Sequence, residues 1–359
     1  MTDFIFVDDH STIPDQFYKV DQIGVDTEFL REKTFLAQLC LIQVATPDQI
    51  YCIDPLRESD YASMWEALCK PEWVVHSGRQ DIEVIYQTAA RMPSSLFDTQ
   101  VAAGLLGYAP QMGYANLVEE LFDVQLPKTH TRADWSQRPL PHALLEYAAD
   151  DVEYLLRAHD VLSEKLDRLG RLDWARQDSA LLLDPALYEI RPGDAIDRLK
   201  GARNLRGARR AIASRLAEWR ESEALARNRP RQWILRDAAL IDMAYRQPQS
   251  LSALKSIDSI PDKVAHRAGD ELLGIIRSAS REESAYRPPQ PPDERQKSLL
   301  RELQSMVAKC ASELGIPAEI VAAKKELSYA VTTGRLDSRV FNDWRRELIG
   351  EALIKKLSA

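Results

Sequence analysis

The segment Gln22–Leu30 reads as a β-strand that carries two acids, Asp26 and Glu28, among apolar residues. Because side chains alternate between the faces of a strand, both carboxylates point the same way. The apolar runs Phe35–Val44 and Ile50–Ile53 predict partner strands in a small meander. In the middle of such a sheet, two neighbouring carboxylates are costly unless a cation lies beside them. A pair of solvated acids on an edge strand is the alternative.

A second pair of polar residues lies on a predicted helix. The pattern of Ala143–Leu156 is helical, and the spacing of Tyr147 and Asp151 stacks them one turn apart on one face. Asp150 lies about 100° away around the helix, so only one of the two adjacent aspartates shares that face. An ordinary buried tyrosine beside a solvated acid is the alternative for this segment.

A third segment combines a short buried strand, a turn and the start of a helix. The strand is Trp73–Val75, the turn is His76–Gln80, and the helix begins at Asp81. Taken alone, Asp81 is explained by capping that helix or by favouring its positive end. His76 taken alone is explained as a hydrogen-bonded structural histidine.

Together the three segments resemble the exonuclease motifs of the DEDD superfamily, in the subgroup whose third motif contains a tyrosine. Within that subgroup, four short sequence segments are similar to those of the bacterial ribonuclease D family: Val25–Phe29, His76–Asp81, Thr131–Trp135 and Glu146–Val152. The resemblance implies an α/β ribonuclease H-like domain, with a mixed sheet flanked by helices. It also implies hydrolysis of RNA from the 3′ end with release of 5′-mononucleotides, in the maturation of tRNA precursors and other small structured RNAs.

The resemblance implies a metal site with Asp26, Glu28, Asp81, Tyr147 and Asp151 as catalytic residues. Hard divalent ions such as Mg²⁺ or Mn²⁺ take oxygen ligands, and four carboxylates suit two ions about 3.5–4 Å apart. By similarity, Asp26 bridges both ions, Glu28 and Asp151 complete the ion that activates water, and Asp81 serves the other. Tyr147, with an ordinary pKa near 10, is a poor base and is expected to orient the water.

Two residues beside these motifs are candidates for contact with substrate. Phe29 follows Glu28 and is expected beside the terminal nucleotide, although spacing alone favours a core phenylalanine. His76 is the second candidate, with the structural role described above as its alternative.

Charge divides the chain into two unequal halves. Residues 1–160 carry 11 Lys and Arg against 26 Asp and Glu, a balance of −15, whereas the remainder carries 36 against 29, a balance of +7. Attraction of phosphate is therefore expected mainly from the second half.

The four cysteines lack Cys-x-x-Cys spacing and read as buried thiols in a reducing compartment. With no apolar run of membrane-spanning length and no basic head at the start, a cytoplasmic protein is expected.

The second half is predicted to be helical and rich in arginine. Residues 198–236 hold 12 Lys and Arg against 3 Asp and Glu, and residues 204–220 predict an amphipathic helix with a basic face. The order of helical steps over residues 206–285 resembles the HRDC domain, which implies an accessory surface for nucleic acid. The candidate phosphate contacts are Arg206, Arg209, Arg210, Arg229 and Arg231. Trp233 is expected in the core, with stacking on a base as the alternative.

The expected organisation is an exonuclease domain with trailing helices over residues 1–195, followed by the HRDC domain over 206–285. A Pro-rich linker over 286–295 leads to a second, degenerate HRDC-like helical domain over 296–359. The family suggests a ring-shaped monomer.

A 3′-5′ exonuclease for DNA shares the same metal chemistry and is the nearest rival, because contacts to a 2′-OH cannot be located from sequence. A non-catalytic RNA-binding scaffold is the rival of a different class.

Overall fold

The computed structural model describes residues 3–9, 13, 17, 19–57, 62–127, 133–282, 284–286 and 291–358. Two parts of the predictions lie outside the described residues: Thr131 and Arg132 of the family-like segment Thr131–Trp135, and residues 287–290 of the predicted linker. The chain forms two compact units. The first comprises Met1–Leu30, Leu39–Tyr188 and Pro291–Ala359, and the second comprises Arg31–Gln38 and Glu189–Gln290.

A six-stranded mixed sheet organises the first unit, with strand order β1-β4-β3-β2-β5-β6. Strands β1 and β4 run parallel, β3 and β4 run antiparallel, and β5 runs parallel to both β2 and β6. Strands β2, β3 and β4 are neighbours in the sheet, as predicted, and the mixed sheet is confirmed. The strands are β1 Phe4–Val7, β2 Gln22–Leu30, β3 Gln38–Ala45, β4 Ile50–Ile53, β5 Glu72–Val75 and β6 Ser95–Asp98.

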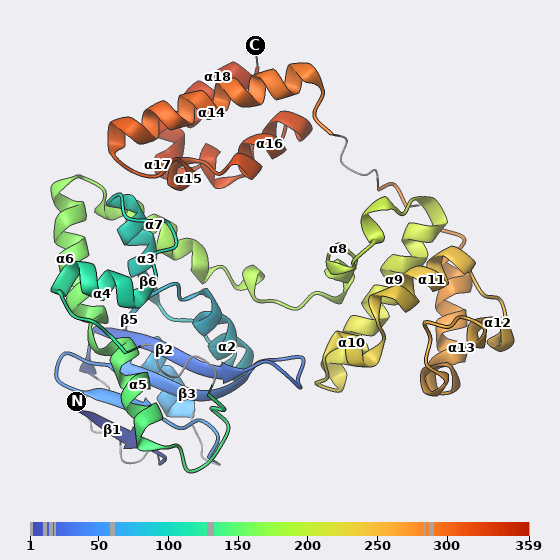
Figure 1. Cartoon of the computed structure of the whole chain (residues 1–359), viewed down its shortest axis with the longest axis horizontal. Helices are drawn as coiled ribbons and strands as arrows, with labels where there is room; N and C mark the ends of the chain where they lie inside the picture. The colour runs from blue at the N-terminus through green and yellow to red at the C-terminus, as the bar shows by residue number, and fades with distance from the viewer. Residues whose placement is uncertain are drawn as a thin grey trace. The chain divides into compact units, whose positions relative to one another are not determined.

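Helices cover the sheet and extend the first unit (Figure 1). They are α1 Ala62–Cys69, α2 Arg79–Ala89, α3 Thr99–Leu105, α4 Tyr114–Phe122, α5 His142–Glu153, α6 Leu155–Arg168 and α7 Leu172–Ala180, followed by the short 3₁₀ turns Leu181–Leu183 and Pro185–Leu187. Apolar residues of α5, such as Leu145 and Ala148, pack with Leu41 of β3 and Val74 of β5 in one core. The sheet and α5 are thus held as one rigid body on which side chains can be positioned.

The C-terminal residues of the first unit form a helical layer of their own. Its elements are α14 Glu294–Leu314, α15 Ala318–Val321, α16 Lys324–Thr333, the 3₁₀ turn Arg339–Phe341, α17 Asp343–Arg345, the π-helical turn Arg346–Gly350 and α18 Glu351–Leu357. A capping box between Asp293 and Gln296 begins α14, and Gly315, with φ at 65°, ends it. The described part of residues 296–359 is helical, as predicted, and its HRDC-like character stays a prediction.

A buried ion pair joins this layer to the exonuclease part. The Arg345 guanidinium donates two hydrogen bonds of 2.6 Å each to the Asp178 carboxylate, and these side chains are 2% and 10% exposed. Trp344 stacks on Trp174 with ring centroids 4.3 Å apart. Arg171 donates to the carbonyl oxygens of Leu105 and Leu314, which adds a second bond across the junction. The layer is therefore fixed by polar bonds that depend on one another.

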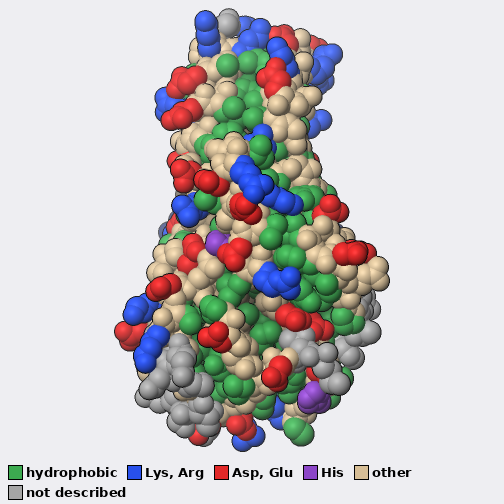
Figure 2. Space-filling model, turned by 90° about the vertical axis from the view of Figure 1, so that its left-hand side faces the viewer, with side chains coloured by type: hydrophobic (Ala, Val, Ile, Leu, Met, Phe, Trp, Pro, Cys, Tyr) green, Lys and Arg blue, Asp and Glu red, His purple; other side chains and the backbone are tan. Residues whose placement is uncertain are grey.

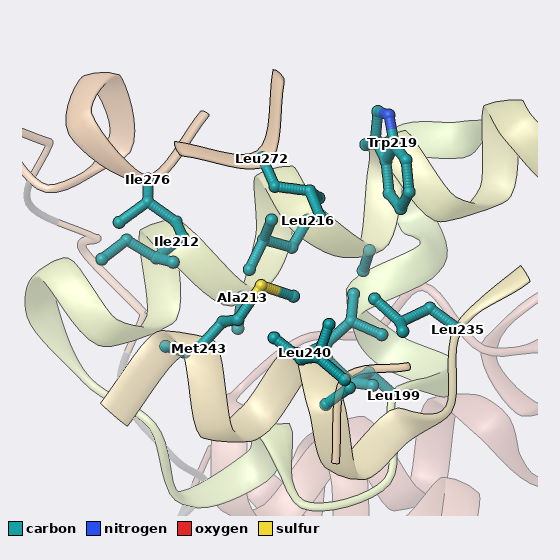
Figure 3. Close-up of a cluster of buried hydrophobic side chains, with 14 of the residues drawn as sticks. Leu199, Ile212, Ala213, Leu216, Trp219, Leu235, Leu240, Met243, Leu272 and Ile276 are labelled. Atoms are coloured by element: carbon teal, nitrogen blue, oxygen red, sulfur yellow. The ribbon is translucent and has the colours of Figure 1, made fainter. Parts of the chain in front are cut away.

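The second unit is a small helical domain around a single apolar cluster. Figure 3 shows Leu216 of α9 and Leu240 of α11 within this cluster. Its elements are the 3₁₀ turn Pro192–Asp194, α8 Ala195–Arg198, the 3₁₀ turn Ala202–Asn204, α9 Gly207–Ala226, α10 Arg231–Ile234, α11 Asp237–Arg246, α12 Leu251–Lys255 and α13 Asp262–Ala279. The segment Arg31–Gln38 belongs to this unit, since the Phe35 and Leu36 amides donate to Asn228 Oδ1.

Two expectations about this domain are wrong. Trp233 is 59% exposed rather than part of the core, because the short helix α10 turns Ile234 inward instead. The basic face predicted for residues 204–220 is interrupted, because Arg210 and Arg220 are buried at 7% and 2% exposure. Arg220 donates to Asp237 Oδ1 at 2.6 Å, so its charge is compensated inside the domain.

The predicted burial of the cysteines is confirmed for three of the four. Cys40, Cys52 and Cys69 are buried, Cys310 is partly buried, and all four are free thiols. Acidic and basic side chains are interspersed on the face drawn in Figure 2. Within the described residues, no helix is both long enough and apolar enough to cross a membrane.

Asp178→Ala tests the ion pair that fixes the C-terminal layer. Removing one partner leaves the Arg345 charge buried and unpaired, so the free energy of unfolding should fall by about 3–5 kcal/mol. Glu351→Ala is the control, because it breaks the exposed pair with Arg346 and should cost less than about 1 kcal/mol. Urea denaturation measures both. Equal midpoints for the two variants would show that the buried pair does not fix the layer.

Candidate active site

Asp26 and Glu28 lie on β2, which is an interior strand between β3 and β5. The edge-strand alternative for this pair is therefore wrong. Thr27 between them is buried, and its Oγ1 donates to Asp81 Oδ1 at 2.5 Å. The strand thus presents two acids to the site and fixes a third through the intervening threonine.

Helix α5 brings Asp151 to the same place. Ligand oxygens of Asp26, Glu28 and Asp151 all lie within 4.8 Å of one another. The three side chains are partly buried, and they come from two elements more than a hundred residues apart in sequence. Three carboxylates at this separation form a set of hard oxygen donors that suits a divalent cation.

The turn before α2 positions Asp81. The Asp98 carboxylate accepts hydrogen bonds of 3.0 Å from the Ser77 and Gly78 amides. A Cβ atom at Gly78 would lie 2.4 Å from Val75 Cγ2, so only glycine fits against the strand there. Asp81 lies in the first turn of α2, whose N-cap is Gly78 without a side-chain bond. Its carboxylate is instead 7% exposed and bonded to Thr27, so capping does not explain it.

Burial raises the pKa of every acid in this group, and nearby negative charges raise each pKa further. Burial, followed by the charges of Asp81, Asp151 and Glu28, raises the pKa of Asp26 well above its usual range. Burial, followed by the charges of Asp151 and Asp81, raises the pKa of Glu28 to about 8. Burial also raises the pKa of Asp151 to about 7 and that of Asp81 to about 6. The four groups cannot all be charged at neutral pH without a compensating cation.

Tyr147 lies one helical turn before Asp151 and hydrogen-bonds to its carboxylate. Burial, then the charges of Asp151, Glu28 and Asp26, raises the pKa of Tyr147 above 10. The phenol is therefore a hydrogen-bond donor at neutral pH and not a base. Its ring centroid lies 6.4 Å from that of Trp135, a buried residue of the segment before α5.

Two residues that support this geometry, Arg138 and Tyr114, were not predicted from the spacing of residues in the sequence. Arg138 donates two bonds of 2.6 Å to the buried carboxylate of Asp54 and one of 2.8 Å to the Trp135 carbonyl, which holds Trp135 in place. The Tyr114 hydroxyl accepts a 3.0 Å bond from the Tyr154 amide at the break between α5 and α6. Both act through contacts distant in sequence, and no local pattern carries that information.

Phe29 and His76 are the two predicted candidates for contact with substrate in this part of the chain. Phe29 is partly buried at the end of β2. Both ring nitrogens of His76 are engaged, with Nδ1 2.9 Å from Thr99 Oγ1 and Nε2 2.8 Å from the Met112 carbonyl. A structural role accounts for His76, and the structure does not support it as a substrate contact.

The five candidate arginines differ in their availability. Arg206, Arg209 and Arg229 are exposed. Arg210 is 7% exposed, and Arg231 donates two bonds of 2.5 and 2.6 Å to the buried carboxylate of Glu221. The last two are therefore tied to intramolecular partners.

Two family models match the chain. One, described as a 3′-5′ exonuclease, matches residues 6–167, and the other, the HRDC domain, matches residues 209–276. A curated ribonuclease D of Gluconacetobacter diazotrophicus is 35% identical over 93% of this chain and 87% of its own length. The chain belongs to the ribonuclease D family. A ribonuclease D of Pseudomonas paraeruginosa is 34% identical over 94% of this chain and 92% of the relative.

Solved structures agree with this membership. The crystal structure of Escherichia coli RNase D, an exoribonuclease involved in structured RNA processing, matches with a TM-score of 0.89 at 26% identity, over 99% of each chain. The predicted family, the exonuclease fold and an HRDC domain are confirmed. The chain is thus a member of a family of 3′-5′ exoribonucleases. The predicted domain limits stay predictions.

The raised pKa values lead to a pH-dependent stabilisation by metal. An acid whose pKa is higher in the folded state than in the unfolded chain stabilises the fold below about pH 4, and this stability is lost as pH rises. For Asp81, Asp151 and Glu28 the loss begins near pH 4 and is complete only as pH passes their folded pKa values of about 6, about 7 and about 8. A bound divalent cation favours the charged carboxylates, so Mg²⁺ should raise the melting temperature more at pH 8 than at pH 6. Thermal unfolding with Mg²⁺ or with chelator measures this, and equal shifts at both pH values would contradict it.

Proposed function

We propose that the chain hydrolyses RNA from the 3′ end by two-metal-ion catalysis and releases 5′-mononucleotides. The observation that carries the proposal is the convergence of Asp26, Glu28 and Asp151 within 4.8 Å, beside a tyrosine one turn from Asp151. A site that binds cations accounts for the cost of burying the four acids together.

Asp26, Glu28, Asp81 and Asp151 would hold two divalent ions, either Mg²⁺ or Mn²⁺. Bound ions would supply an acidified water and would offset the charge that develops on the phosphate oxygens. Asp26 would bridge both ions, and the charges of Asp81, Asp151 and Glu28 all raise its pKa. Glu28 and Asp151 would hold one ion, and Asp81, which accepts a hydrogen bond from Thr27, would hold the other.

Tyr147 would orient the attacking water and not deprotonate it. Its pKa lies above 10, so the hydroxyl keeps its proton at neutral pH. The bond with Asp151 directs the hydroxyl toward the carboxylate group that completes the metal site. Trp135, fixed by Arg138, restricts the position of the ring.

The proposed substrates are tRNA precursors and other small structured RNAs. The support is the family membership and the match to Escherichia coli RNase D, which is an exoribonuclease involved in structured RNA processing. A monomeric, cytoplasmic enzyme stays our prediction from composition and family. Hydrolysis of DNA is the second candidate, because the same metal chemistry acts on either sugar.

Digestion of a 5′-labelled tRNA-like transcript with a short 3′ extension tests the proposal. With Mg²⁺ or Mn²⁺ the label should appear in a ladder that shortens from the 3′ end, and chelator should abolish it. Asp26→Asn should lower the rate more than about 100-fold, the range seen even for groups that only support metal ligands. Asp173→Asn is the matched control, since that side chain is 83% exposed and should leave the rate unchanged.

Three outcomes contradict parts of the proposal. Binding without shortening under any metal would leave only an RNA-binding scaffold. Equal rates for the Asp26→Asn and control variants would place catalysis elsewhere. A matched DNA strand digested faster than the RNA would favour the DNA exonuclease.

A further inference from the structure

The second unit contains a cavity of about 460 Å³ with four basic residues among the nine that line it. It is lined by α8, by the turn that follows it and by Tyr286 after α13: Ile196, Asp197, Arg198, Leu199, Lys200, Gly201, Arg203, Arg210 and Tyr286. Of these residues only Arg210 falls within the match to the HRDC domain, which covers residues 209–276. The cavity is therefore built mainly by segments that flank that domain.

Two of the four cations at the cavity are already paired. Arg198 donates to the buried carboxylate of Glu221 at 3.0 Å, and Arg210 lies 3.6 Å from Asp197. Lys200 and Arg203 are exposed, and neither has an acidic partner within the described residues. The cavity thus keeps two positive charges that the rest of the domain does not offset.

The backbone that carries these two cations is fixed. Leu199 and Ala202 are 4% and 1% exposed and are part of the apolar cluster, where Figure 3 labels Leu199. The Ala202 amide donates to the Leu199 carbonyl at 3.1 Å, and Gly201, with φ at 93°, permits this tight turn. Lys200 and Arg203 therefore project from a short, anchored segment, which reduces the entropy lost when they bind an anion.

An aromatic ring completes the cavity. The Arg210 guanidinium carbon lies 3.4 Å from the Tyr286 ring centroid, so a cation–π contact holds the ring at the cavity wall. Cations beside an aromatic ring are the combination with which proteins bind single-stranded nucleic acid, because phosphates meet the cations and bases stack on the ring.

We propose that this cavity binds a single-stranded segment of RNA, with Lys200 and Arg203 on its phosphates and a base on Tyr286. The proposal rests on the proposed function and deepens it, because it names a second contact for the same substrate. Ring and cations together favour a nucleic-acid strand over a free anion, which would need only the cations.

The test measures binding and hydrolysis separately. The full chain with Asp26→Asn, which is not expected to hydrolyse RNA, is titrated with fluorescent single-stranded RNA at several salt concentrations. Lys200→Ala with Arg203→Ala should weaken binding and lower the salt slope by about 1.4, at about 0.7 for each lost phosphate contact. Lys255→Ala with Arg281→Ala is the matched control, since both residues are exposed, lie in the same unit and do not line the cavity.

Tyr286 variants test the stacking part. Tyr286→Leu should weaken binding about 5- to 150-fold, the range for loss of one base–aromatic stack, while the salt slope stays the same. Tyr286→Phe should retain the wild-type affinity. Inorganic phosphate is added as a competitor, because a simple anion site would be filled by it.

The outcomes separate this proposal from the proposed function. Equal affinities and slopes for the cavity and control pairs would overturn the cavity proposal. Competition by phosphate together with no effect of Tyr286→Leu would also overturn it in favour of a free-anion site. Hydrolysis of a dinucleotide by chains that retain Asp26 reports on the metal site. If the unsubstituted chain does not hydrolyse the dinucleotide, the proposed exonuclease function is refuted and the cavity proposal is not.

Discussion

The gathering of four desolvated carboxylates is the constraint on which the exonuclease part of the structure depends. Burial raises the pKa of Asp26, Glu28, Asp81 and Asp151, and the charges of other members of the group raise the pKa of Asp26 and Glu28 further. Nothing in an apolar core requires such a group, and its members come from β2, α2 and α5. The fold must therefore hold the acids together against repulsion until a cation compensates them.

Contacts with residues distant in sequence supply this restraint. Thr27 bonds Asp81 from within the strand that carries Asp26 and Glu28. Asp98 accepts the amides of the turn before α2, so the position of that helix depends on a residue of β6. Arg138 uses the buried Asp54 to fix Trp135 against Tyr147. Each restraint joins segments that are remote in sequence, which places the acids on a rigid frame.

Much of the site could be predicted from the sequence because its spacing is local. Alternation along β2 pairs Asp26 with Glu28, and the helical turn pairs Tyr147 with Asp151. Trp233 was mispredicted, because the inward direction of the four-residue helix α10 is set by Ile234 and by tertiary packing. Arg210 and Arg220 read as surface charges, yet partners that arrive from other elements let the domain bury them. Periodicity cannot reveal such partners.

Counting the bound ions tests the central claim most directly, that these carboxylates form one site for two cations. Mn²⁺ can be titrated into the metal-free chain at pH 8, where Glu28 begins to ionise without metal, and free Mn²⁺ can be followed by its electron paramagnetic resonance signal. The account predicts two ions for each chain, with coupled loss of both in the Asp26→Asn variant. One ion, or two that persist unchanged in that variant, would contradict it.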